Sequence, residues 1–394
     1  MSSTVGEIRT LLEKAYPPAL AESWDKVGLI CGDPAEPVDT VAFALDCTQE
    51  VAERAVALGA QMLVVHHPLL LRGVHSVAAD TPKGRVLHTL IRGGVALFAA
   101  HTNADSARPG VNDKLAELVG ITPGAPIVAQ PAPAKDHWGV HIPAEAVESV
   151  KSALFSAGAG EIGDYRECSF DIDGTGQFRP VEGANPAEGS VGELHRGPEV
   201  RVEFVAARRR RAAILSALRY THPYEEPAFD IVALEDDTPA DQATGLGRIG
   251  ELPEPMTLRE FTQHVADVLP ETAWGVRCAG DPEQIVQRVA VSSGAGDSFL
   301  DAVRGLGVDV YVTSDLRHHP VDEYLRAGGP AVIDTAHWAS EFPWTSQAAE
   351  VVAAGAEVRT EIIDIRTDPW TLGARRSGAQ DRSSEGQEKN SWDS

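Results

Sequence analysis

Short apolar runs that stop abruptly at polar residues dominate the first hundred residues of the chain. Val41–Leu45, Met62–Val65 and Val95–Ala100 are three such runs, and their unbroken hydrophobicity is typical of strands buried on both faces. Segments with the apolar spacing of amphipathic helices lie between them, at about 49–58 and 81–92. This alternation predicts an α/β fold with a mixed, mostly parallel sheet core and helices on both of its faces.

The pattern changes after two proline-rich stretches near residue 125. The strands and helices that it then predicts are, in chain order, a strand at 138–142, a helix at 144–157, strands at 168–172 and 200–205, a helix at 211–218 and a strand at 229–233. The order βαββαβ is that of a ferredoxin-like α+β domain. We therefore expect such a domain at 126–242, inserted into a discontinuous α/β domain made of 1–125 and 243–372.

The strand and helix alternation resumes after this insert, with strands expected at 285–291, 308–312 and 331–334. The segment Gly245–Gly250 matches the G-x-G-x-x-G pattern of dinucleotide-binding loops. No strand precedes it and prolines follow where a helix should begin, so we interpret it as a turn that returns the chain to the main sheet. Residues 375–394 are polar and charged, which predicts a disordered tail.

Charge and composition limit the kinds of partner that the chain is expected to bind. The formal net charge of −24 over 394 residues argues against nonspecific nucleic-acid binding, which needs cations to displace counterions from phosphates. The chain has neither an apolar run of the roughly 18–20 residues that a membrane span needs nor an amino-terminal signal segment, so we expect a cytoplasmic protein without membrane contact. Its four cysteines have no metal-binding spacing and are expected to be reduced.

Residue types that bind metal ions follow three of the predicted strands. They are His66 and His67, then His101 and Asp105, then His337 and Glu341. Within each of the last two pairs the residues are four apart, so one helical turn after the strand places both side chains on one face. Neighbouring residues of an extended chain point in opposite directions, which favours two adjacent ions for His66 and His67.

The donor types suggest which ions these are. Imidazole and carboxylate ligands without thiolate favour two divalent zinc ions per subunit, with iron and manganese as alternatives. Two such ions could share a hydroxide and polarise a carbonyl or phosphoryl oxygen.

Several longer motifs carry a family resemblance. They are Trp24–Leu29, His66–Gly73, His101–Asp105, Gly110–Asp113, His222–Pro227, Thr313–His319 and Asp334–Glu341. With these motifs the chain resembles the GTP cyclohydrolase I type 2 homologues, also called NGG-interacting-factor-three-like proteins, over about residues 4–370. The resemblance implies a toroidal homohexamer, a dinuclear metal centre that faces an internal cavity, and a PII/CutA-like insert.

Carried over by position, the resemblance implies six metal ligands: His66, His67, His101, Asp105, His337 and Glu341. The family usually has Asp-Ala-Gly-His-Tyr-x-Thr-Glu in the last motif, where this chain has Thr335, Ala336, Trp338 and Ser340 at four of the positions. Ser314 likewise replaces the glycine of Thr-Gly-Asp. The ligand spacing is unchanged, while the choice of substrate is left open.

The leading hypothesis from the sequence is a metal-dependent hydrolase, GTP cyclohydrolase-like or phosphoesterase-like. It would act on a nucleotide or other small molecule through a metal-bridged hydroxide, with His319 or Asp46 relaying protons. The alternative is a non-catalytic metal-binding or regulatory hexameric scaffold. An open coordination position would distinguish the first from the second.

Overall fold

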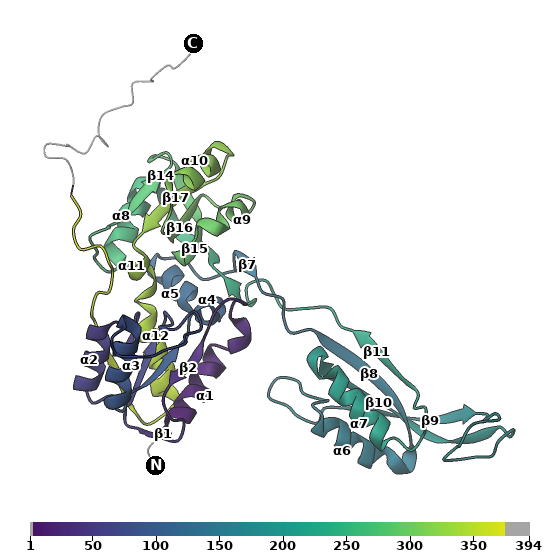
Figure 1. The fold of residues 1–394 in the computed structure, drawn as a ribbon. Helices are drawn as coiled ribbons and strands as arrows, with labels where there is room; N and C mark the ends of the chain where they lie inside the picture. Colours follow the sequence, from purple (N-terminus) through teal and green to yellow (C-terminus); the bar gives the residue numbers. More distant parts are fainter. Residues whose placement is uncertain (1–2, 375–394) are drawn as a thin grey trace. The chain divides into compact units, whose positions relative to one another are not determined.

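A computed structural model describes residues 3–374 of the chain and divides it into two compact units (Figure 1). One unit comprises the chain up to Gln130 and from Ala240 onward, and the other is Pro131–Pro239. The insert expected from the sequence covered 126–242, and the expected tail at 375–394 lies outside the described residues. Among the described helices, none is long and apolar enough to cross a membrane.

The larger unit contains two five-stranded sheets. The first, in spatial order, is β18 (Arg359–Ile362), β4 (Thr40–Ala44), β5 (Met62–Val65), β6 (Ala96–Ala99) and β2 (Gly28–Cys31). The second is β13 (Arg248–Thr257), β15 (Ile285–Ala295), β16 (Val310–Ser314), β17 (Ala331–Thr335) and β14 (Arg277–Ala279). The expectation of one main sheet was therefore wrong. Antiparallel β2 forms one edge of the first sheet, and antiparallel β13 and β14 form the two edges of the second; no pairing between described strands joins the two sheets.

Helices cover both faces of the first sheet, as expected. They are α1 (Val5–Ala15) and α12 (Trp344–Gly355) on one face, and α2 (Gln49–Ala57) and α3 (Pro82–Arg92) on the other. In β5, Met62 and Val64 pack toward the first pair, and Leu63 and Val65 toward the second. Because successive side chains of a strand alternate between faces, burial on both sides explains the unbroken apolar run in the sequence.

The second sheet is covered in the same way and provides the other half of the larger unit. Helices α5 (Val111–Leu118), α8 (Leu258–Val268) and α11 (His337–Glu341) pack on one face, and α9 (Leu300–Arg304) and α10 (His318–Arg326) on the other. Helix α8 begins with a capping box formed by Thr257 and Glu260, in which each side chain binds the other's backbone N–H. All residues of β16 and β17 are buried, so the positions of their carboxyl ends are set by packing.

The smaller unit has the predicted βαββαβ order. Its elements are β8 (Lys135–Pro143), α6 (Val147–Ser156), β9 (Phe170–Phe178), β10 (His195–Ala207), α7 (Arg211–Thr221) and β11 (Phe229–Ala233). The sheet order β11-β8-β10-β9, all antiparallel, is that of a ferredoxin-like fold. Trp138 stacks on Phe204 in its core, with ring centroids 5.7 Å apart. The relationship of this unit to PII or CutA proteins stays a prediction.

The segment Gly245–Gly250, predicted to return the chain to the main sheet, leads into the second sheet and contains a buried arginine, Arg248. Strand β12 (Gly245–Leu246) pairs with β7 (Val128–Ala129), and Arg248 then begins β13. The Arg248 side chain is fully buried and donates hydrogen bonds to both carboxylate oxygens of Asp113, at 2.8 and 2.7 Å. It also donates to the backbone carbonyls of Ala107, Gly245 and Gly247, so it joins segments that are far apart in the sequence.

We expect Arg248→Met to destabilise the larger unit by about 3–5 kcal/mol, because Asp113 would be left as an unpaired buried charge. Urea unfolding followed by circular dichroism measures the loss. The matched control is Arg259→Met, which removes an exposed ion pair to Glu283 and should change the free energy of unfolding by less than about 1 kcal/mol. Equal effects of the two substitutions would contradict the assignment.

Candidate metal centre

All six predicted metal ligands come together at the carboxyl ends of strands from both sheets. His66 and His67 follow β5, His101 follows β6, Asp105 lies in α4 (Thr102–Ser106), and His337 and Glu341 are the first and last residues of α11. Their side chains form three overlapping groups in which the potential ligand atoms lie within 4.8 Å of one another. The groups are His66, His67 and His101; His67, His337 and Glu341; and His66, Asp105 and Glu341. Each group could hold a metal ion.

The four imidazoles are oriented by an oxygen acceptor at Nδ1. The contacts are His66 to the backbone carbonyl of Ala100 at 2.8 Å, His67 to Asp46 at 2.7 Å, His101 to Asp25 at 2.9 Å, and His337 to Asp315 at 2.7 Å. A carbonyl or carboxylate oxygen can only accept, so each Nδ1 carries a hydrogen and each neutral ring presents an Nε2 lone pair. Histidines that bind metal ions are commonly held in this way.

The Nε2 atoms and carboxylates converge, and with neutral rings they present lone pairs to one another. His67 Nε2 and His337 Nε2 are 3.3 Å apart, and both lie close to Glu341 Oε2, at 2.9 and 3.1 Å. Yet Glu341 Oε2 and the fully buried His66 Nε2 have no hydrogen-bond partner among the described residues. Lone pairs at such separations repel unless a proton or a metal ion lies between them. The donor set therefore fits a bound cation.

Residues at the end of β15 support the two carboxylate ligands. The Ser293 hydroxyl donates to Asp105 Oδ1 at 3.2 Å. Gly294 has φ of 62°, and a Cβ there would lie 2.3 Å from Glu341 Oε1, so only glycine leaves room for this carboxylate. Sequence analysis identified neither role, although a Ser-Gly pair at the end of a buried strand was a usable signal.

The electrostatic environment favours positive charge on two of the rings. The Glu341 carboxylate raises the pKa of His337 to about 11, against the effect of burial and with help from Asp315. Burial lowers the pKa of His67, but Glu341 and Asp46 outweigh it and raise the value to about 10. Without a metal ion these rings would hold protons at neutral pH, so an incoming metal ion must displace them.

The two residues predicted to relay protons occupy different surroundings. Asp46 accepts from His67 Nδ1 and from the Thr367 hydroxyl, which makes it a positioning residue for that ring. His319 is exposed on α10 and belongs to none of the three ligand groups. No observation tests proton transfer by either residue, and it stays a prediction.

Sequence reasoning missed two carboxylates that position histidines. Asp25 and Asp315 lie within motifs that were identified, but neither was assigned as a partner of His101 or His337. Asp315 adopts φ of 57°, a left-handed conformation that aspartate tolerates better than most residues. An aspartate at the end of a predicted strand was the only available signal.

Known proteins resemble the chain along most of its length. The family model described as Duf34/NIF3 (NGG1p interacting factor 3) matches residues 3–369. A Mycobacterium tuberculosis protein named GTP cyclohydrolase 1 type 2 homolog is 54% identical over 375 residues, which is 94% of this chain and 98% of the relative. A Bacillus subtilis protein of the same name is 38% identical over 335 residues, 85% and 88% of the two chains.

Solved structures agree with the sequence comparisons. A Bacillus cereus protein related to NIF3 is 34% identical and has a TM-score of 0.72, covering 94% of this chain and all of the other. The Staphylococcus aureus protein SA1388 is 29% identical with a TM-score of 0.77, covering 94% and 99%.

Metal binding to this cluster should release protons and strengthen as the pH rises. The raised pKa values of His67 and His337 mean that both rings must lose a proton to bind, so the affinity for Zn²⁺ should increase across about pH 6 to 9. Calorimetry in buffers of different ionisation enthalpy counts the protons released per ion. A count of zero, with a pH-independent affinity, would contradict the proposed roles of the two rings.

Asp46→Asn should weaken metal binding by about 10–100-fold, because an amide no longer fixes the His67 ring as the carboxylate does. Competition with a chromophoric chelator measures the change. Asp301→Asn is the control, since Asp301 is exposed on α9 and its side chain pairs only with Arg304 in the described structure. Unchanged affinity in Asp46→Asn would show that this contact does not position the ring for a metal ion.

Proposed function

Because the chain belongs to the Duf34/NIF3 (NGG1p interacting factor 3) family, as its motifs predicted, we propose that its metal centre is dinuclear and hydrolytic. One ligand group contains His67 and His337, and another contains His66 and Asp105. Glu341 is the single residue that belongs to both. This division supports two ions with Glu341 as a ligand of both, and His101 as an additional ligand. Nitrogen and carboxylate donors favour zinc, with iron and manganese as alternatives.

The observation that carries the proposal is that the cluster is closed on one side and open on the other. The side chains of His66 and Glu341 are 0% and 5% exposed, whereas those of His67 and His337 are 25% and 33% exposed. A purely structural metal site is closed all round, whereas a catalytic one keeps a position for water or substrate. When bound, divalent ions lower the pKa of water and polarise carbonyl or phosphoryl oxygens.

The residues of this chain prepare the site for that chemistry. Asp46 and Asp315 hold the exposed rings of His67 and His337 with their Nε2 atoms toward the cluster, so the geometry needs little reorganisation when a substrate binds. Gly294 leaves space for Glu341 beside them. These contacts orient the two imidazole rings and fix their tautomers.

The substrate that we propose is a nucleotide or a related small molecule. Several relatives carry the name GTP cyclohydrolase 1 type 2 homolog, which suggests hydrolytic opening of a guanine ring. A phosphoester fits the same donor set. We further propose that the chain assembles as a homohexamer. A non-catalytic metal-binding or regulatory scaffold is the alternative, and the experiment below separates the two.

Asp105→Ala and Glu341→Ala should each abolish hydrolysis by the purified, metal-loaded protein. Both remove a carboxylate from the centre, and Glu341 is the residue that the His67–His337 group shares with the His66–Asp105 group. The assay screens GTP, other nucleotides and phosphoesters, with metal content measured on the same samples. Asp301→Asn should retain wild-type turnover. Metal-loaded wild-type protein without turnover on any of these substrates would favour the scaffold. Turnover that survives in both metal-free variants would show that the metal centre does not carry the hydrolysis.

A further inference from the structure

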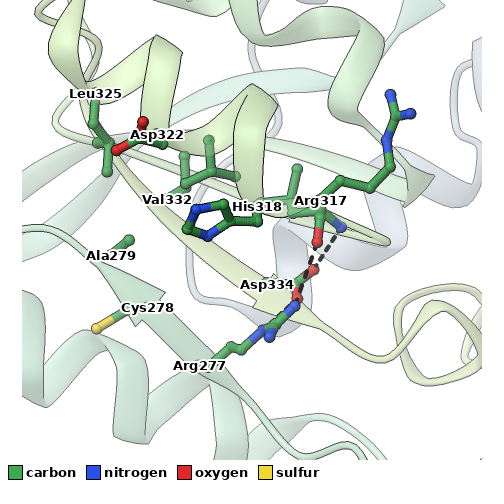
Figure 2. A pocket seen from close by; sticks show the side chains of 11 residues that line it. Arg277, Cys278, Ala279, Arg317, His318, Asp322, Leu325, Val332 and Asp334 are labelled. Carbon is green, nitrogen blue, oxygen red and sulfur yellow. Dashed lines mark hydrogen bonds and ion pairs between the residues drawn. The ribbon is translucent and has the colours of Figure 1, made fainter.

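A second cavity lies on the α10 side of the second sheet, and none of the six metal ligands lines it. Its volume is about 350 Å³, within the range of ~300–1,000 Å³ that is usual for small-molecule sites. One part of the lining is apolar and comprises Ala279, Val321, Leu325 and Val332. Figure 2 shows Arg277 and Asp334 together at one end, Asp322 and Leu325 at the other, and the His318 ring between them.

Arg277 is held in a fixed orientation at the polar end of the cavity. Its guanidinium lies 4.7 Å from the centroid of the Trp274 ring, and its Nε donates to Asp334 at 2.7 Å. Nη2 is also engaged, by Asp334 and the Leu316 carbonyl. Nη1 has no acceptor in the described part of the chain, and the side chain is 60% exposed. A pre-oriented arginine with a free donor is well suited to bind a carboxylate or phosphate oxygen.

The carboxylates around the cavity are already neutralised by neighbouring arginines. Asp334 pairs with Arg277, and Asp322 pairs with Arg326 at 3.2 Å. The Arg317 side chain extends away from the cavity in Figure 2 and pairs with Asp297 at 2.5 Å. The lining therefore carries no unpaired negative charge that would repel an anion.

The amino terminus of α10 adds two further donors beside the cavity. Arg317, the N-cap residue, makes no side-chain cap, and the first turn contains no acidic residue. The uncapped backbone N–H groups and the positive end of the helix dipole therefore favour negative charge near His318. This contribution only reinforces Arg277, whose orientation and free donor carry the argument.

We propose that this cavity binds a small organic anion, with its carboxylate or phosphate group on Arg277 and its apolar body against Ala279 and Val332. The binding site goes beyond the proposed hydrolysis and does not depend on it. The site requires both parts of the ligand, since inorganic phosphate would leave the apolar lining uncovered and a neutral molecule would leave Arg277 Nη1 without a charged acceptor.

Calorimetric titration of the full chain with four probes of six carbon atoms each tests this assignment. Hexanoate and hexylphosphonate are the anions, hexanamide is the neutral analogue and hexylamine the cationic one. We expect saturable binding of at least one anion, about tenfold or more tighter than that of hexanamide, because a hydrogen bond to a charged group adds about that much. The two anions distinguish a carboxylate ligand from a phosphate ligand.

Two substitutions locate the binding. Arg277→Met should weaken anion binding by about tenfold or more, and Ala279→Phe should abolish it by filling the cavity while Arg277 stays in place. Arg304→Met, on α9 and outside the cavity lining, is the control and should bind as the wild type does. Thermal unfolding establishes that each variant folds. If Arg277→Met does not fold, Ala279→Phe decides. Three results would overturn the proposal: failure of both anions to bind at millimolar concentration, equal binding of hexanamide, or wild-type affinity in folded Arg277→Met or Ala279→Phe.

Discussion

The central constraint on this structure is the crowding of imidazole lone pairs and carboxylates in a largely buried cluster. His66 Nε2 and Glu341 Oε2 have no hydrogen-bond partner within the described residues, and unpaired buried polar groups are costly. An arrangement that is unfavourable in isolation persists because strong packing on both sheets holds it in place. Protons or metal ions can compensate it, and the donor set is that of transition-metal sites.

The two sheets of the larger unit contribute different residues to the candidate metal centre. The first sheet contributes His66, His67, His101 and Asp105 from the carboxyl ends of β5 and β6, and the second contributes His337 and Glu341 after β17. Parallel strands direct their carboxyl ends to one edge of a sheet, which is where α/β proteins build their sites. Two separate sheets in one unit therefore bring two such edges to a single cluster. The buried Arg248–Asp113 pair stabilises this unit at the point where the chain re-enters it.

Local signals in the sequence predicted much of the fold and the ligand set. Unbroken apolar runs predicted β4, β5 and β6, and the βαββαβ order of the smaller unit is as expected. The six candidate ligands were identifiable because His, Asp and Glu follow predicted strands, two of the pairs at helical spacing. The division into two sheets was not predictable, since it depends on which strands pair with one another across long stretches of the chain. The partnerships of Asp25 and Asp315 with histidines 76 and 22 residues away depend on the same tertiary arrangement.

The second cavity and the metal centre share the connections that follow β16 and β17. Asp315 holds His337, and the next residue, Leu316, lines the cavity and donates its backbone N–H to Asp334. Asp334 in turn holds Arg277 and lies three residues before His337. The proposed anion would bind Arg277 Nη1 while Asp334 keeps Nε and Nη2, so it would join the hydrogen bonds that run from Arg277 through Asp334 to the connection after β16. If an anion in the cavity changes the affinity of the cluster for a metal ion, linkage requires the metal ion to change the affinity of the cavity by the same factor.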